Sequence, residues 1–207
     1  MSTVHRATAA PRIVATTLLG GLITGLLGMA SVAAEETPDA QLEIVLDSSG
    51  SMGAADPGGG TKIEAARAAL NGAVDVLPDE AAVGVRVYGG RYDDEARGCT
   101  DTRLVTPLGP LDRTASKAAF AGLRPLGYTP IAFSLEQAAT DFTTQGPRTI
   151  VLVSDGEETC GGNPCEVART LAQAGVDLRV DTVGYAADPA TRQQLQCIAE
   201  ATGGQYS

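Results

Sequence analysis

Histidine is nearly absent from the sequence, and the single copy, His5, lies close to the N-terminus. Because the apolar segment after His5 is typical of a cleaved targeting sequence, we expect the mature protein to contain no histidine. A chain without histidine has no Ser-His-Asp triad, no imidazole general base and no histidine-ligated metal. These exclusions argue against an enzyme and favour a binding protein.

Aromatic residues are also scarce: tryptophan is absent, and aromatic side chains make up only 4% of the 207 residues. The core must therefore be built mainly from valine, leucine, isoleucine and alanine. Glycine (25 residues) and proline (11 residues) are frequent, which indicates many turns between regular elements. The length and the 43% hydrophobic content fit one globular domain.

The N-terminus is expected to direct export. Two arginines precede an uncharged apolar run over residues 13–30, and small residues follow at 31–34. This pattern is typical of a secretory signal peptide, so we expect cleavage of residues 1–34 and a short linker over 35–40. An uncleaved membrane anchor is the alternative, but four glycines interrupt the run. We expect a periplasmic, cell-envelope or extracellular protein without a membrane span in the mature chain.

The chain is acidic, with a formal net charge of −10. Such a charge repels nucleic acid and anionic lipid surfaces, so we expect no nucleic-acid partner. An acidic chain is compatible with cation binding. The acidic residues at 93–95 and 157–158 are expected to form a solvated rim.

Apolar runs predict five strands. Residues 41–46 and 149–153 are almost continuously apolar, which is typical of strands buried on both faces of a parallel sheet. Further strands are expected at residues 82–88, 103–106 and 178–183, with 103–106 at an edge.

Five helices are expected between and after these strands. Each begins at a residue that can cap a helix: Thr61, Asp112, Thr129, Asn163 and Asp188. Thr61 also forms a capping box with Glu64. The alternation predicts an α/β domain over residues 41–207, doubly wound, with a mainly parallel sheet, one antiparallel edge strand and helices on both faces.

Oxygen-bearing side chains lie where predicted strands end. Asp47, Ser49 and Ser51 follow the first strand, Asp155 follows residues 149–153, and Thr129 lies in a turn before a helix. Ligands of open α/β sheets bind beyond the C-terminal strand ends, so we expect these side chains to converge. Carboxylates and hydroxyls suit a hard cation: Mg²⁺, or else Mn²⁺ or Ca²⁺. The simpler interpretation is that the Asp and Ser residues only cap turns.

The sequence Asp-Ser-Ser-Gly-Ser at 47–51, Thr-Pro at 129–130 and Asp-Gly at 155–156 together resemble the von Willebrand factor type A (VWA) domain with its metal-ion-dependent adhesion site (MIDAS). The resemblance covers residues 41–207 and points to an exported bacterial member. It implies a Rossmann-like fold in which Ser49, Ser51 and Thr129 bind the metal directly. Asp47 and Asp155 would act directly or through water.

The resemblance also implies a function. In this family a protein partner supplies an Asp or Glu carboxylate to the open position of the ion, so the expected function is metal-dependent protein binding or adhesion. Two alternatives remain open. One is a metal-assisted hydrolase with Asp47 or Asp155 as base or nucleophile. The other is a domain that the ion only stabilises and that binds through another face.

Four cysteines in an exported chain predict two disulfides, and they are Cys99, Cys160, Cys165 and Cys197. A four-thiolate zinc site is the alternative, but the spacing lacks paired C-x-x-C units. With the strand order of the VWA family, a Cys99–Cys197 bond is too long. Two pairings remain: Cys99–Cys160 with Cys165–Cys197, which we favour, and Cys99–Cys165 with Cys160–Cys197.

The sequence departs from the VWA family pattern at its C-terminal end. VWA domains usually continue with a complete last strand and a closing helix, whereas residues 205–207 can form only the start of that strand. We therefore expect the domain over 41–207 to lack the final helix.

Overall fold

The sheet determines where every other element lies. In the computed structural model, which describes residues 40–174 and 177–207, five strands lie in the order β3-β2-β1-β4-β5. Their bounds are β1 (Gln41–Asp47), β2 (Ala82–Tyr88), β3 (Thr102–Thr106), β4 (Arg148–Ser154) and β5 (Leu178–Gly184). All neighbours pair in parallel except β2 and β3. The predicted parallel sheet with one antiparallel edge strand is confirmed. The predicted signal peptide and residues 35–39 of the predicted linker lie outside the described residues.

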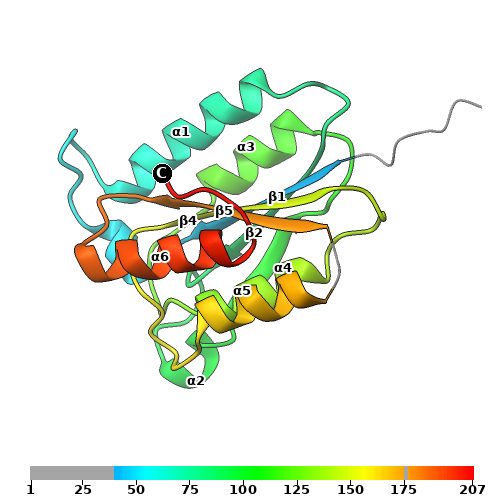
Figure 1. Ribbon diagram of the computed structural model, residues 1–207. Helices are drawn as coiled ribbons and strands as arrows, with labels where there is room; N and C mark the ends of the chain where they lie inside the picture. The colour runs from blue at the N-terminus through cyan, green and yellow to red at the C-terminus, as the bar shows by residue number, and fades with distance from the viewer. Residues whose placement is uncertain (1–39, 175–176) are drawn as a thin grey trace, which may run out of the picture. The chain divides into compact units, whose positions relative to one another are not determined.

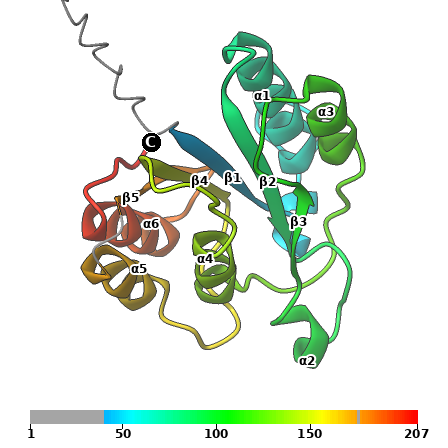
Figure 2. The same ribbon diagram turned by 90° about the vertical axis from the view of Figure 1, so that its right-hand side faces the viewer.

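Helices cover both faces of the sheet, as Figures 1 and 2 show. The helices α1 (Lys62–Val76) and α3 (Arg113–Ala121) pack on one face. The helices α4 (Ile131–Ala139), α5 (Pro164–Gln173) and α6 (Pro189–Ala201) pack on the other. Two short helices, η1 (Gly50–Gly53) and α2 (Glu95–Gly98), lie in segments for which no helix or strand was predicted.

The central strand β1 is largely buried because both of its faces are covered. Ile44 and Leu46 belong to the core beneath α1 and α3, whereas Val45 belongs to the core beneath α4, α5 and α6. Successive side chains of a strand point to opposite faces, so one strand serves two cores. This arrangement places the C-terminal end of β1 in the middle of the sheet edge beyond which open α/β sheets generally bind ligands.

The predicted caps hold for four of the five helices. Glu64 accepts a hydrogen bond of 2.8 Å from the backbone N of Thr61, as in a capping box. The side chains of Asp112, Asn163 and Asp188 each accept a hydrogen bond from a backbone N–H in the first turn of their helix.

The prediction that Thr129 is the N-cap of α4 is wrong. Pro130 occupies the N-cap position and α4 begins at Ile131. The physical reason is that the Thr129 backbone bonds the loop after β4. Its N–H donates to Thr159 Oγ1 at 2.8 Å, and its carbonyl accepts from the Thr159 N–H at 3.2 Å.

Two disulfides link segments that follow β2, β4 and β5: Cys99–Cys160 and Cys165–Cys197. This is the favoured pairing, and with all four cysteines bonded no four-thiolate zinc site forms. The first bond ties the end of α2 to the loop after β4, and the second joins α5 to α6. The first bond therefore anchors the segment after Asp155, and the second holds the helix that follows this segment.

The last residues run beside β5. The N–H of Thr182 donates to the Gln205 carbonyl at 2.8 Å, and the N–H of Ser207 donates to the Thr182 carbonyl at 2.9 Å. These bonds fit the predicted start of a further strand. Within residues 40–174 and 177–207, none of the helices has the length and apolar character needed to cross a membrane.

Candidate functional site

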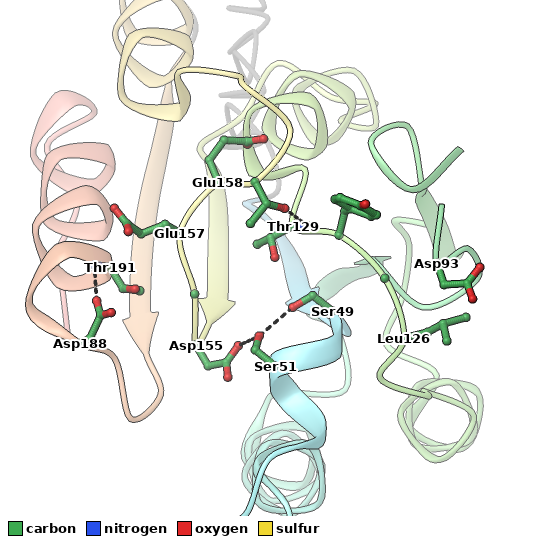
Figure 3. A pocket seen from close by; sticks show the side chains of 14 residues that line it. Ser49, Ser51, Asp93, Leu126, Thr129, Asp155, Glu157, Glu158, Asp188 and Thr191 are labelled. Carbon is green, nitrogen blue, oxygen red and sulfur yellow. Dashed lines mark hydrogen bonds between the residues drawn. The ribbon is translucent and has the colours of Figure 1, made fainter. Parts of the chain in front are cut away.

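The predicted oxygen donors gather at the C-terminal ends of β1 and β4, which are neighbours in the sheet. Ser49, Ser51, Thr129 and Asp155 line one pocket of about 530 Å³, and Figure 3 shows their side chains around it. Asp47 does not line the pocket, and its side chain lies buried at the end of β1. We refer to these five residues together as the candidate metal centre.

Hydrogen bonds link the two loops of the candidate metal centre. The hydroxyl oxygens of Ser49 and Ser51 are 3.0 Å apart, and Ser51 Oγ donates to Asp155 Oδ1 at 2.6 Å. Ser51 lies in η1, the short helix that the sequence did not predict. This turn brings Ser51 back toward β4, so a motif contiguous in sequence meets an aspartate 104 positions away.

Asp47 is a fully buried carboxylate whose two oxygens are both occupied. Oδ1 accepts from the Ser49 backbone N–H at 2.7 Å, and Oδ2 accepts from the Ser154 hydroxyl at 2.6 Å. Burial raises the pKa of the Asp47 carboxyl above its ordinary value, against the lowering effect of the Ser154 and Ser49 hydrogen bonds. Asp47 therefore fixes the backbone that carries Ser49.

Sequence reasoning missed two residues that support Asp47. Ser154 is the last residue of β4, and Tyr88 is the last residue of β2. The Tyr88 hydroxyl donates to Ser154 Oγ at 3.1 Å, and burial raises the pKa of Tyr88 well above its usual range. A serine at the end of a predicted buried strand, directly before Asp155, was the available signal.

The turn that carries Thr129 is held against the rest of the site by close backbone contacts. Gly127 N–H donates to the Gly89 carbonyl at 2.7 Å, and Gly50 N–H donates to the Gly127 carbonyl at 3.0 Å. A Cβ atom at Gly127 would lie 1.9 Å from the Tyr92 carbonyl oxygen. Gly127 thus allows the turn to approach closely enough for Thr129 to face Ser49 and Ser51.

A lysine that sequence reasoning did not assign to the site contacts it directly. Lys62, the first residue of α1, places its Nζ 2.7 Å from Asp155 Oδ2. The two oxygens of Asp155 are thus occupied by the Ser51 hydroxyl and by an ammonium group.

The donor set fits a hard divalent cation. Within the described ranges no group of three or more His, Cys, Asp or Glu side chains is arranged to hold a metal. The candidate metal centre instead places three hydroxyls and the Asp155 carboxylate at the pocket, with the Asp47 carboxylate buried behind Ser49. Oxygen ligands of this kind suit Mg²⁺, Mn²⁺ or Ca²⁺. Asp155 already holds one cation, the Lys62 ammonium, which shows that this position favours positive charge.

The acidic residues around the pocket differ in role. Asp93 and Glu157 line the pocket and are exposed, as expected for a solvated rim. The same prediction is wrong for Glu158, whose carboxylate accepts from the backbone N–H groups of Ala132 and Cys160, each at 2.8 Å. Glu158 thus stabilises the first turn of α4, next to Thr129.

Comparisons with known proteins identify the family of the chain. The family model of the von Willebrand factor type A domain matches residues 42–158. The uncharacterized protein YwmD of Bacillus subtilis (strain 168) is 31% identical over 193 residues, which cover 90% of this chain and 86% of YwmD.

Solved structures show the same fold. A von Willebrand factor type A protein from Catenulispora acidiphila has a TM-score of 0.62 and 27% identity, over 83% of this chain and 38% of that one. Proximal thread matrix protein 1 of the mussel byssus, solved with a zinc-occupied MIDAS motif, has a TM-score of 0.59 and 20% identity, over 82% of this chain and 41% of that one. On the family match and the fold, the chain belongs to the von Willebrand factor type A domain family.

Proposed function

We propose that this chain is a divalent-metal-dependent protein-binding or adhesion domain of an exported protein. The observation that carries the proposal is the hydroxyl of Ser51. It lies within hydrogen-bonding distance of both Ser49 and Asp155, in a pocket that Thr129 also lines. Ser49, Ser51 and Thr129 would hold the ion through their hydroxyls. The mussel relative with a zinc-occupied MIDAS motif supports a divalent ion at this position, and Mg²⁺ is our first choice.

A carboxylate from a protein partner would complete the site. The three hydroxyl ligands are neutral, and both oxygens of Asp47 are already committed to Ser49 and Ser154. A divalent ion held mainly by neutral ligands remains electrophilic and attracts an anionic ligand from outside. The open pocket gives an Asp or Glu side chain of a partner access to Ser49, Ser51 and Thr129.

The hydrolase alternative has less support. A general base or nucleophile must reach a substrate, but Asp47 is buried and Asp155 is bound by Ser51 and Lys62. The sequence supplies no histidine after residue 5 to replace them.

Export is part of the proposal. Two disulfides indicate an oxidising compartment, which agrees with cleavage of a signal peptide over residues 1–34. We propose that the mature domain acts in the periplasm, in the cell envelope or outside the cell.

A pull-down from the native cell envelope tests this function. The wild-type domain is expected to capture a protein partner in Mg²⁺ and to release it in EDTA. Thr129→Ala is expected to abolish capture, whereas the matched control Thr140→Ala, just after the other end of α4, is expected to retain it. Capture by the wild type in EDTA, together with full capture by Thr129→Ala, would show that another face binds the partner.

A further inference from the structure

Lys62 forms a salt bridge with Asp155 of the candidate metal centre, and the proposed function of the site does not require this contact. Its Nζ lies 2.7 Å from Asp155 Oδ2, and the side chains of Lys62 and Asp155 are only 16% and 0% exposed. A contact this well shielded is weakly screened by water and salt. It is therefore a stronger interaction than an ordinary surface ion pair.

The position of Lys62 at the start of α1 is electrostatically unusual. The N-terminus of a helix carries a partial positive charge, so a lysine there is disfavoured unless an anion lies nearby. Asp155 supplies that anion. The Lys62 backbone is also fixed, because its N–H donates to the Ala54 carbonyl, directly after η1, at 3.0 Å. The residue that ends the short helix carrying Ser51 thus anchors the lysine beside the site.

Asp155 needs a cation when no metal is bound. Its side chain is fully shielded, and a buried carboxylate without a partner is costly. The Lys62 ammonium supplies the missing charge. A divalent ion held by Ser49, Ser51 and Thr129 would share the same carboxylate, and two cations beside one carboxylate repel each other.

We propose that Lys62 is an internal counter-ion of the metal centre, which neutralises Asp155 in the metal-free protein and is released from it when a divalent ion binds. This inference rests on the proposed metal-dependent function. It gives the chain a stable metal-free state and lowers the affinity of the site for metal.

Calorimetric titration with Mn²⁺ tests the effect on affinity. Removal of a neighbouring positive charge is expected to tighten Mn²⁺ binding by Lys62→Met about tenfold relative to wild type. Lys62→Arg keeps the charge and is expected to match the wild type. The control Lys117→Met removes a more exposed lysine that pairs with Asp75, and it is also expected to match. Equal or weaker Mn²⁺ binding by Lys62→Met overturns the proposal.

Lysine acetylation followed by mass spectrometry tests the release in the wild-type chain and does not depend on how the variants fold. The sequence contains only two lysines, Lys62 and Lys117, so each peptide is assigned without ambiguity. In EDTA, Lys62 is expected to react more slowly than Lys117. Mn²⁺ is expected to accelerate the reaction of Lys62 and to leave Lys117 unchanged. If Lys62 is acetylated at the same rate with and without Mn²⁺, the proposed release of Lys62 from Asp155 is refuted.

The two proposals fail in different ways. If neither the wild type nor Lys62→Met binds Mn²⁺, the metal centre itself is wrong and the role of Lys62 falls with it. If both bind Mn²⁺ with the same affinity, only the role of Lys62 is wrong and metal-dependent binding stands.

Discussion

Ser154 donates a 2.6 Å hydrogen bond to Asp47, across 107 positions of sequence, and so joins the end of β4 to the end of β1 beneath the pocket. Both residues are completely buried. The bond orients the Asp47 carboxylate, whose other oxygen accepts from the Ser49 backbone N–H. The buried contact between Ser154 and Asp47 therefore helps to position Ser49, a proposed metal ligand.

We expect Ser154→Ala to lower the free energy of unfolding by about 1–3 kcal/mol, because the buried Asp47 carboxylate loses one of its two donors. Urea unfolding measures this loss. Tyr88→Phe is the control, since the Tyr88 hydroxyl donates to Ser154 and its removal leaves both donors to Asp47 in place. A smaller loss is expected for Tyr88→Phe, and the reverse order would contradict the central role of Ser154.

The sequence was sufficient to predict the sheet and most of the candidate metal centre, because both depend on local patterns. The apolar runs of β1 and β4 predict buried parallel strands, and the ends of such strands meet at one edge. Asp155 directly follows β4 and Ser49 lies two positions after β1, so their convergence required little knowledge of loop conformation.

The roles of Lys62 and Glu158 could not be predicted from the sequence, because their contacts form only in the tertiary structure. Lys62 reaches Asp155 only because η1 turns the chain back and sets the start of α1 beside the pocket. Glu158 binds the first turn of α4 only because the loop after β4 folds over it. Neither contact has a periodic or spacing signal, since each joins residues more than 25 positions apart.

Gly127→Ala is expected to destabilise the protein and to weaken metal binding together. Its Cβ atom would lie 1.9 Å from the Tyr92 carbonyl oxygen, so the turn before Thr129 must move. We expect a loss of about 1–3 kcal/mol in the free energy of unfolding, as for other overpacked sites. Mn²⁺ titration and urea unfolding measure the two effects.

Gly72→Ala is the matched control for Gly127→Ala. Gly72 lies within α1, and a Cβ atom there would have no neighbour within 4 Å. Alanine is expected to stabilise the helix by about 0.5–1 kcal/mol and to leave Mn²⁺ binding unchanged. Equal metal binding by the two variants would show that the close approach of Gly127 does not position Thr129.

Both disulfides are expected to stabilise the fold, but only Cys99–Cys160 is expected to affect metal binding. Replacing either pair by serine should cost about 2–4 kcal/mol of unfolding free energy. Only loss of Cys99–Cys160 is expected to weaken Mn²⁺ binding as well, because Cys160 directly follows Thr159, which bonds the Thr129 backbone. Loss of Cys165–Cys197, which joins α5 to α6, should leave Mn²⁺ affinity unchanged. Calorimetry on both double variants distinguishes these outcomes.

A buried charged cluster lies on the sheet away from the metal centre. Arg86 of β2 donates through Nε to Glu43 of β1 at 3.2 Å and to Asp141, just after α4, at 2.8 Å. Two carboxyl groups thus share one guanidinium. Burial of Glu43, reinforced by the nearby Asp141 carboxylate and opposed by Arg86, raises the pKa of Glu43 from 4.5 to about 9. Glu43 is therefore protonated in the folded protein at neutral pH.

This raised pKa predicts that the protein becomes less stable as the pH rises. Between pH 4.5 and about 9 the folded state holds a proton on Glu43 that the unfolded state has released. The contribution of that proton is complete below pH 4.5 and is lost as the pH approaches 9, with a slope of at most about 1.4 kcal/mol per pH unit.

Glu43→Gln mimics the protonated carboxyl and is expected to flatten this part of the curve of unfolding free energy against pH. The exposed control Glu80→Gln should keep the wild-type slope. Urea unfolding between pH 5 and pH 9 measures all three proteins, and a Glu43→Gln slope equal to that of the wild type would mean that Glu43 is ionised in the core.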